Sequence, residues 1–129
     1  REQPDAQCAL EATVFRLPPG VDWSGLPLTV QLAEATRESP KQEIWRSAIA
    51  PMQRGDLEMV WLESRFVDQE EHREALARYL LARRLPIQIF ISFAYWPEDA
   101  DRFVPVWDEV VRSLRLAEFV APPFQEHPN

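Results

Sequence analysis

The stretch "PIQIFISFAY", Pro86 to Tyr95, decides the fold. In an extended chain successive side chains point to opposite faces, and here both faces are apolar. The two faces hold Ile87, Ile89, Ile91, Phe93 and Tyr95, and Phe90, Ser92 and Ala94. A strand that is this apolar on both sides predicts a central position in a β-sheet, with a neighbouring strand at each edge.

The segment before it, Arg73 to Arg83, is rich in Ala, Leu, Glu and Arg, so its local propensity is helical. Because the central strand needs a partner, and "RRLP" suits a hairpin, we predict a strand instead. The polar "DQEEH" then turns this strand back onto "LEMVWLESRFV", Leu57 to Val67. The faces of that earlier strand carry Val60, Leu62 and Phe66, and Met59 and Trp61.

The last element is an amphipathic helix within "RFVPVWDEVVRSLRL", Arg102 to Leu116. Its apolar stripe consists of Phe103, Val106, Trp107, Val110, Val111 and Leu114. Asp99 or Asp101 can cap the start, and Pro105 is expected in the first turn of the main helix, where its missing N–H costs nothing. A stripe this wide predicts packing against a sheet face.

The N-terminal half predicts two strands and a helix. A strand from Ala9 to Leu17 ends at "PPG", and the alternation from Leu28 to Ala33 indicates a half-buried strand. A helix is expected after Ser39 as N-cap and Pro40 at the first helical position. Its stripe would hold Trp45, Ala48, Ile49 and Met52, and Pro51 with Gly55 would close it.

The composition fits one soluble domain. The chain has 129 residues, 46% of them hydrophobic, and a net charge of −7, which argues against nucleic acid as a partner. We predict a flexible N-terminal arm at 1–8, one α+β domain at 9–119 and an extended C-terminal tail at 120–129. Cys8 is the only cysteine, so no internal disulfide forms, and no apolar run is long enough to span a bilayer.

Two motifs resemble the Mog1/PsbP-like fold family: "FRLPPGVDW", Phe15 to Trp23, and the closing "FVPVWDEVVRSLRL". The bacterial relatives implied are the DcrB-type group and the Eag-type chaperones of type VI secretion. The resemblance covers residues 9–119, and it departs from the family pattern where two residues separate Gly20 from Trp23. It implies an antiparallel sheet with helices packed on it, an α/β/α sandwich. It also implies non-enzymatic work as an accessory subunit, chaperone or adaptor.

The search for catalytic chemistry points away from an enzyme. His72 lies in "EEHRE" and could act as a general base beside its glutamates, but a solvated histidine in a charged turn is the favoured interpretation. No second histidine lies at metal-ligand spacing from it. There is no GxSxG motif, and glycines at 20, 25 and 55 alone form no phosphate loop. We therefore predict no catalytic residue, metal or cofactor.

Five tryptophans in so short a chain favour a partner-binding surface. We expect a groove on a sheet face that no helix covers, with the partner site drawn from Trp61, Met59, Phe90, Tyr95, Trp96 and Trp23. The alternative is that both faces are covered and these residues are core.

These observations lead to a binding module, chaperone- or adaptor-like, that holds a protein or apolar peptide segment on an apolar sheet face. One alternative is an extracytoplasmic accessory subunit or lipoprotein-type domain, and a weaker one is a small hydrolase centred on His72. The compartment stays open: cytoplasmic, or periplasmic if a leader was removed before Arg1. The oligomeric state stays open too, a homodimer included.

Overall fold

The computed structural model describes residues 8–37 and 42–117. The elements, in chain order, are β1 (Cys8–Arg16), η1 (Trp23–Gly25), α1 (Leu28–Arg37), β2 (Gln42–Arg46), β3 (Ala50–Arg54), β4 (Leu57–Asp68), β5 (Arg73–Arg84), β6 (Ile87–Tyr95), η2 (Pro97–Asp99) and α2 (Ala100–Ser113). Most of the predicted arm and all of the predicted C-terminal tail lie outside the described residues, although Cys8 is the first residue of β1.

The strands form one antiparallel sheet in the order β1-β6-β5-β4-β2, with β3 also paired to β4. Strand β6 lies between β1 and β5, so its predicted central position is confirmed. Strands β2 and β3 share one edge of β4: β2 pairs with its C-terminal half and β3 with its N-terminal half. The predicted α+β class, an antiparallel sheet with helices packed on it, is also confirmed.

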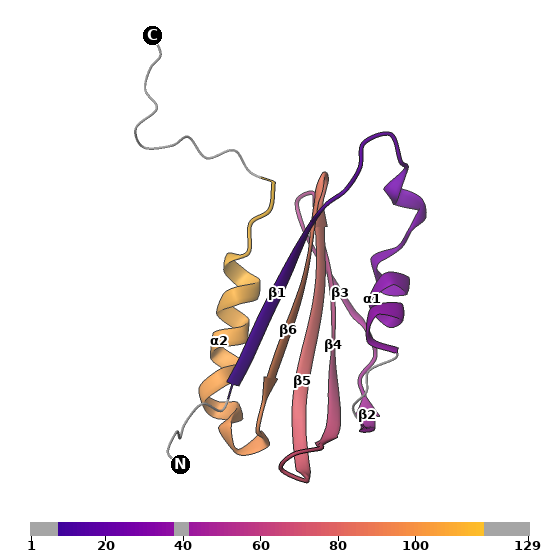
Figure 1. Cartoon of the computed structure of the whole chain (residues 1–129). Helices are drawn as coiled ribbons and strands as arrows, with labels where there is room; N and C mark the ends of the chain where they lie inside the picture. Colours follow the sequence, from indigo (N-terminus) through magenta and orange to yellow (C-terminus); the bar gives the residue numbers. More distant parts are fainter. Residues whose placement is uncertain (1–7, 38–41, 118–129) are drawn as a thin grey trace.

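The two helices lie on opposite sides of the sheet (Figure 1). The core beneath α2 is drawn from β4, β5 and β6 and is centred on Phe93, Leu80 and Trp107. The core beneath α1 is built on Leu32, with Leu62 of β4 among its contacts. The result is a helix–sheet–helix sandwich in which alternate strand residues enter different cores.

The predicted strand at 73–83 is confirmed, and burial explains why it overrides helical propensity. Strand β5 spans Arg73–Arg84 and pairs with β4 on one side and β6 on the other. Its apolar residues are buried on both faces, from Ala75 to Ala82. A helix would bury one stripe only, whereas the central strand position buries both sets of side chains.

The predicted strand at 28–33 is wrong, because this segment is helix α1. Its buried residues are Leu28, Leu32 and Thr36, which recur every four positions along one helical face. Val30, which completed the apparent alternation, is exposed. The alternation was therefore too short to distinguish a strand from a helix.

The predicted helix after residue 39 is also wrong, because strands β2 and β3 replace it. Trp45 and Met52, two members of its supposed stripe, are exposed. These strands form by backbone pairing to the edge of β4 and need no buried side-chain face. The proposed cap, Ser39 and Pro40, lies outside the described residues.

The closing helix is confirmed, but the role predicted for Pro105 is wrong. Helix α2 begins at Ala100 with Asp99 at the N-cap position, so Pro105 lies inside it rather than in its first turn. Pro105 is exposed, so the Asp101 carbonyl that loses its donor lies on the solvent side of the helix. Val106, counted in the predicted stripe, is exposed as well.

Candidate functional site

Three of the predicted partner-binding residues belong to the core beneath α2. Met59 and Tyr95 are only 1% and 3% exposed. Trp61 is half-buried and packs against Trp107, with 5.7 Å between the ring centroids. The α2 helix therefore covers the face on which these three side chains lie, and it leaves Met59 and Tyr95 inaccessible to a partner.

The other three lie elsewhere. Phe90 is on the α1 side of the sheet and stacks on Tyr79 at 6.1 Å, and Trp96 carries the Arg73 guanidinium 3.8 Å from its ring centroid. Trp23 belongs to η1, in the loop between β1 and α1. The expectation of a groove on an uncovered sheet face is corrected, because strand alternation places Met59, Trp61 and Tyr95 on one face and Phe90 on the other, and each face carries a helix.

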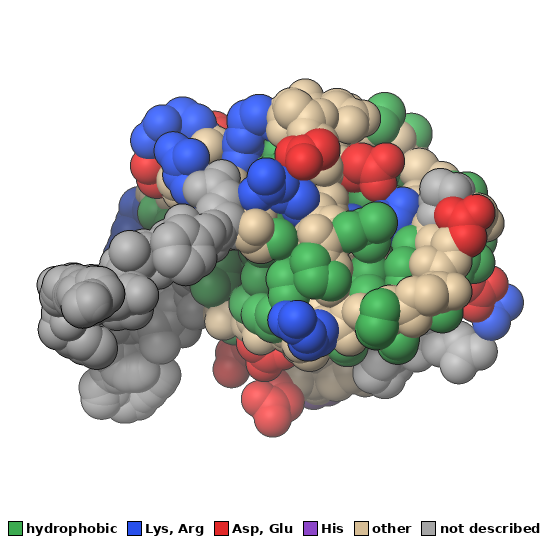
Figure 2. Space-filling model, turned by 90° about the horizontal axis from the view of Figure 1, so that it is seen from above, with side chains coloured by type: hydrophobic (Ala, Val, Ile, Leu, Met, Phe, Trp, Pro, Cys, Tyr) green, Lys and Arg blue, Asp and Glu red, His purple; other side chains and the backbone are tan. Residues whose placement is uncertain are grey.

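A set of exposed apolar side chains lies instead on two segments that meet at the end of the sheet where β1 ends: the loop between β1 and α1, and the β5–β6 turn. We name it the apolar end and define it as Val21, Leu26 and Leu85, which are 50%, 45% and 58% exposed. Seen from this end, hydrophobic side chains occupy the middle of the surface and basic side chains gather along one side (Figure 2). Large apolar groups gathered on one surface are typical of a partner site.

The loop that carries the apolar end is held in place by hydrogen bonds. Arg83 is buried, and its Nη1 donates to the carbonyl oxygens of Trp23 and Leu26, each at 3.1 Å. The Leu17 amide donates to the Pro86 carbonyl at 2.7 Å, which ties the start of the loop to the β5–β6 turn. Val21 and Leu26 are thus presented by a pinned loop, beside the β5–β6 turn that carries Leu85.

A cleft of about 340 Å³ adjoins Leu85. Its lining residues are Trp23, Gln53, Asp56, Glu58, Arg83, Arg84 and Leu85. The charges in it are paired: Arg83 with Glu58 at 3.0 Å and Arg84 with Asp56 at 2.9 Å. The cleft therefore offers Trp23 and Leu85 as apolar walls, with charges already neutralised by their own partners.

Two of the arginines near this end bind the C-terminus of α2 and the segment that follows it. Arg54 donates to the Val111 carbonyl at 3.1 Å and to the carbonyl of Leu114, the C-cap residue, whereas Arg84 Nη1 donates at 2.9 Å to the Leu116 carbonyl beyond the helix end. The last carbonyls of a helix have no partner within the helix, and a guanidinium both satisfies them and complements the helix dipole. These side chains are accounted for by the fold and form no anion site.

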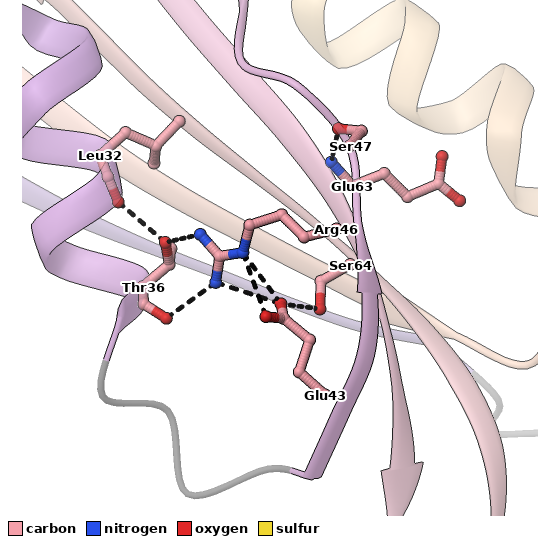
Figure 3. Close-up of polar contacts among 7 residues, drawn as sticks. All are labelled: Leu32, Thr36, Glu43, Arg46, Ser47, Glu63 and Ser64. Atoms are coloured by element: carbon pink, nitrogen blue, oxygen red, sulfur yellow. Dashed lines mark hydrogen bonds and ion pairs between the residues drawn. The ribbon is translucent and has the colours of Figure 1, made fainter.

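The other end of α1 is fixed by a polar network centred on Glu43 (Figure 3). The Arg46 Nε donates to both Glu43 carboxylate oxygens at 3.1 Å, and Ser64 Oγ also donates to this carboxylate. Arg46 further donates to Thr36 Oγ1 at 2.8 Å and to the Thr36 carbonyl at 3.0 Å. The network joins β2 to β4 and to the C-terminal turn of α1, which is a structural role.

His72, the candidate general base, lies apart from any metal-ligating cluster among the described residues. His72 lies exposed in the β4–β5 turn with a φ of 55°, and its amide donates to the Asp68 carbonyl at 2.8 Å. No three metal-ligating side chains cluster in the ranges 8–37 and 42–117. In the same ranges, no helix is both long and apolar enough to cross a membrane.

The exposed aliphatic residues of the apolar end are absent from the predicted partner site, because aromatic residues dominate that prediction. A usable signal was present: Val21 follows "PPG" and Leu85 lies in "RRLP", so both are large apolar residues beside turn formers. Turn residues point outward, so an apolar side chain there is more informative than a tryptophan on a strand.

A comparison with known sequences places the chain in a family. The model of the Alr1449 family matches residues 1–120. The chain belongs to the Alr1449 family. One relative, the uncharacterized protein alr1449 of Nostoc sp. (strain PCC 7120), is 36% identical over 124 residues. The match covers 95% of this Alr1449-family chain but 64% of the relative, so the chain spans a little under two thirds of that protein.

Solved structures similar to this Alr1449-family chain share its fold at low sequence identity. The crystal structure of PA94, a protein of unknown function from Pseudomonas aeruginosa, has a TM-score of 0.59 at 17% identity, with 92% of each chain covered. The solution structure of PsbP (CyanoP) from Synechocystis sp. PCC 6803 has a TM-score of 0.51 at 13% identity, with 84% of this chain and 67% of that chain covered. The architecture is thus the α+β, Mog1/PsbP-like fold predicted from the sequence.

Proposed function

We propose that this chain is a non-catalytic protein-binding module, chaperone- or adaptor-like, that holds an apolar segment of a partner protein at the apolar end. One observation carries the proposal: the apolar side chains at this end are exposed to solvent, and hydrogen bonds hold the neighbouring backbone in place. Val21, Leu26 and Leu85 are large, apolar and about half exposed, yet Arg83 pins the loop between Trp23 and Leu26.

Preorganisation of the loop favours binding at the apolar end. Covering about half-exposed aliphatic side chains removes apolar surface from water, and each such side chain contributes on the order of 1 kcal/mol when fully covered. A mobile loop would lose conformational entropy on binding and cancel much of that gain. Here the loop is already fixed, so more of the gain is available for affinity.

The most concrete version of this proposal is a shielding role like that implied by the resemblance to the Eag-type chaperones, which cover apolar helices of other proteins. An accessory-subunit role would use the same surface with a permanent partner. A hydrolase centred on His72 has less support, because that side chain is exposed in a turn with no metal-ligand cluster around it among the described residues.

The test begins with a photo-crosslinking amino acid placed at residue 85 and, as a matched control, at residue 106. Val106 is also a large exposed aliphatic residue, at 46%, but it lies on α2, away from the apolar end. Crosslinks in the native cell that form from residue 85 but not from residue 106 identify the partner by mass spectrometry.

The identified partner is then purified and titrated calorimetrically. Leu85→Ser and Val21→Ser should each weaken binding about tenfold, whereas Val106→Ser should leave it unchanged. Circular dichroism should stay the same for all three variants, because the side chains are exposed. Equal affinity of the wild type and Leu85→Ser for that partner would overturn the proposal.

A further inference from the structure

The two edges of the sheet are built differently. At one edge β2 and β3 are five residues each, the β2 register shifts between Glu43 and Trp45, and β3 contains Pro51. Short strands, bulges and proline are the features that prevent edge-to-edge pairing. That edge is therefore protected.

The opposite edge, formed by β1, has none of these protections. All nine residues from Cys8 to Arg16 pair with β6 in one unbroken register, so the strand is straight and complete. It contains no proline, and no other described strand pairs with its outer side (Figure 1). Leu10 and Val14 are 49% and 62% exposed beside this row of backbone donors and acceptors.

We infer that β1 pairs with β1 of a second copy of this chain, antiparallel about a two-fold axis at Ala12, to give one continuous sheet across a homodimer. This register overlaps all nine residues of the strand, with Cys8 opposite Arg16. It uses a surface separate from the apolar end and stands without the proposed function.

The side chains on the α2 side of β1 fit this register. Ala12 lies opposite its own copy on the axis, where a small residue leaves room, and Leu10 lies opposite Val14 on each side of it. Directly opposed apolar pairs of this kind stabilise an antiparallel sheet. The exposed Leu10 and Val14 thereby cover each other.

The side chains on the α1 side fit it equally well. Glu11 lies opposite Thr13, and Ala9 lies opposite the large ring of Phe15. A shift by two residues in one direction would place Glu11 opposite Glu11, and a shift in the other would place Leu10 opposite Arg16. The register centred on Ala12 is thus the one that avoids both conflicts.

The helices leave room for the pairing. The core under α2 is drawn from β4, β5 and β6. In the dimer the two β6 strands would be separated by three strand spacings, about 14 Å, which exceeds the diameter of a helix. Because the strands run antiparallel, the two apolar ends would face away from each other and leave both partner sites open.

The first test introduces a charge at position 13. Thr13 is exposed and lies opposite Glu11 in the proposed register. Thr13→Lys should tighten the dimer and Thr13→Glu should loosen it, each by about two- to thirtyfold in dissociation constant, since two symmetric pairs change. Sedimentation velocity over a concentration series measures the constant. The swap Glu11→Lys/Thr13→Glu restores opposite charges in both pairs, so it should tighten the dimer as Thr13→Lys does.

The second test fixes the register by crosslinking in a Cys8→Ser background. Ala12→Cys should give a disulfide-linked dimer on mild oxidation, because opposed Cα atoms lie about 4.5–5.5 Å apart. Leu10→Cys alone should give far less, whereas an equimolar mixture of Leu10→Cys and Val14→Cys chains should give mixed dimers. Circular dichroism verifies that each variant folds.

Any of three results would overturn the inference. One is a monomer at every concentration, and another is that Thr13→Lys and Thr13→Glu shift the dissociation constant in the same direction. Crosslinking from Ala12→Cys no faster than from the exposed control Val106→Cys would also overturn it. Binding at the apolar end can fail or succeed independently, because Leu85→Ser does not touch β1.

Discussion

Arg83 and Glu58 form an ion pair across β5 and β4, with 3.0 Å between Arg83 Nη2 and Glu58 Oε1, although one side chain is buried and the other half exposed. The same guanidinium also binds the carbonyls of Trp23 and Leu26. One buried cation therefore joins the sheet to the loop that presents the apolar end.

Replacing Arg83 by Met should lower the free energy of unfolding by about 2–4 kcal/mol, because two loop carbonyls and a carboxylate lose their donor. Glu58→Gln should cost less than about 1 kcal/mol, since its side chain is half exposed and still offers an acceptor. Urea unfolding of both variants measures the difference. Equal losses would show that the loop carbonyls do not depend on Arg83.

The core beneath α2 depends on one aromatic cluster. Trp107 stacks on Phe93 with 5.8 Å between centroids, and Arg78 lies 4.9 Å from the Trp61 ring and 5.8 Å from that of Trp107. Trp107→Ala should lower the free energy of unfolding by about 3–5 kcal/mol, because it empties this core.

The matched control is Val106→Ala, one residue away on the exposed side of α2. It should change the free energy of unfolding by no more than about 0.5 kcal/mol in the same urea titration. Losses of similar size from the two variants would mean that α2 does not pack as described.

The central sheet could be predicted because its strands are apolar on both faces, a pattern that an amphipathic helix with one apolar stripe does not satisfy. Strand β5 shows this best, because the need of β6 for a paired neighbour predicts a strand there despite the helical propensity of the segment. The edge elements carried no such constraint. Helix α1 has only Leu28, Leu32 and Thr36 buried, and β2 with β3 is held by backbone pairing, which leaves no mark on side-chain periodicity.

The candidate site could not be predicted because it depends on which residues the fold leaves exposed. Tryptophan is most informative where it is exposed, yet Trp61 and Trp107 pack against each other beneath α2. Leu85 becomes part of the candidate site only because the Leu17–Pro86 hydrogen bond holds the β5–β6 turn beside the loop after β1. The spacing of residues along the sequence does not predict that contact.

Pro105 should be a stabilising position for substitution. It lies inside α2 and is exposed, so Pro105→Ala would restore an N–H that can reach the Asp101 carbonyl without disturbing the core. Part of this gain in stability is offset, because the unfolded chain has more conformational entropy with alanine than with proline. We expect a net increase of about 1–2 kcal/mol in the free energy of unfolding by urea titration.

Pro97→Ala provides the contrast. Pro97 is the first residue of η2, where the proline ring matches the required backbone angle and no donor is lost. That variant should be neutral or slightly destabilising. A gain at residue 97 equal to that at residue 105 would attribute the effect to proline content rather than to the helix interior.

The free energy of unfolding should decrease at acidic pH because the Glu43 carboxylate becomes protonated. Burial opposes its ionisation, but hydrogen bonds from Ser64 and Arg46 and the charge of Arg46 outweigh that effect and lower the pKa of Glu43 below its ordinary value of 4.5. A carboxyl whose pKa is lower in the folded state than in the unfolded state contributes stability above the ordinary value. That contribution disappears as the pH falls through the folded-state pKa.

Urea unfolding at a series of pH values from about 6 to 3 should therefore show a decline that begins near pH 4.5 and is shallower in Glu43→Gln than in the wild type. Glu34→Gln is the matched control, because Glu34 pairs with Arg37 at 3.1 Å on the exposed side of α1 without burial. It should reproduce the wild-type slope. If Glu43→Gln declined as steeply as the wild type, the carboxylate would not be coupled to folding, and the link from β2 to α1 would depend on the Arg46–Thr36 hydrogen bonds alone.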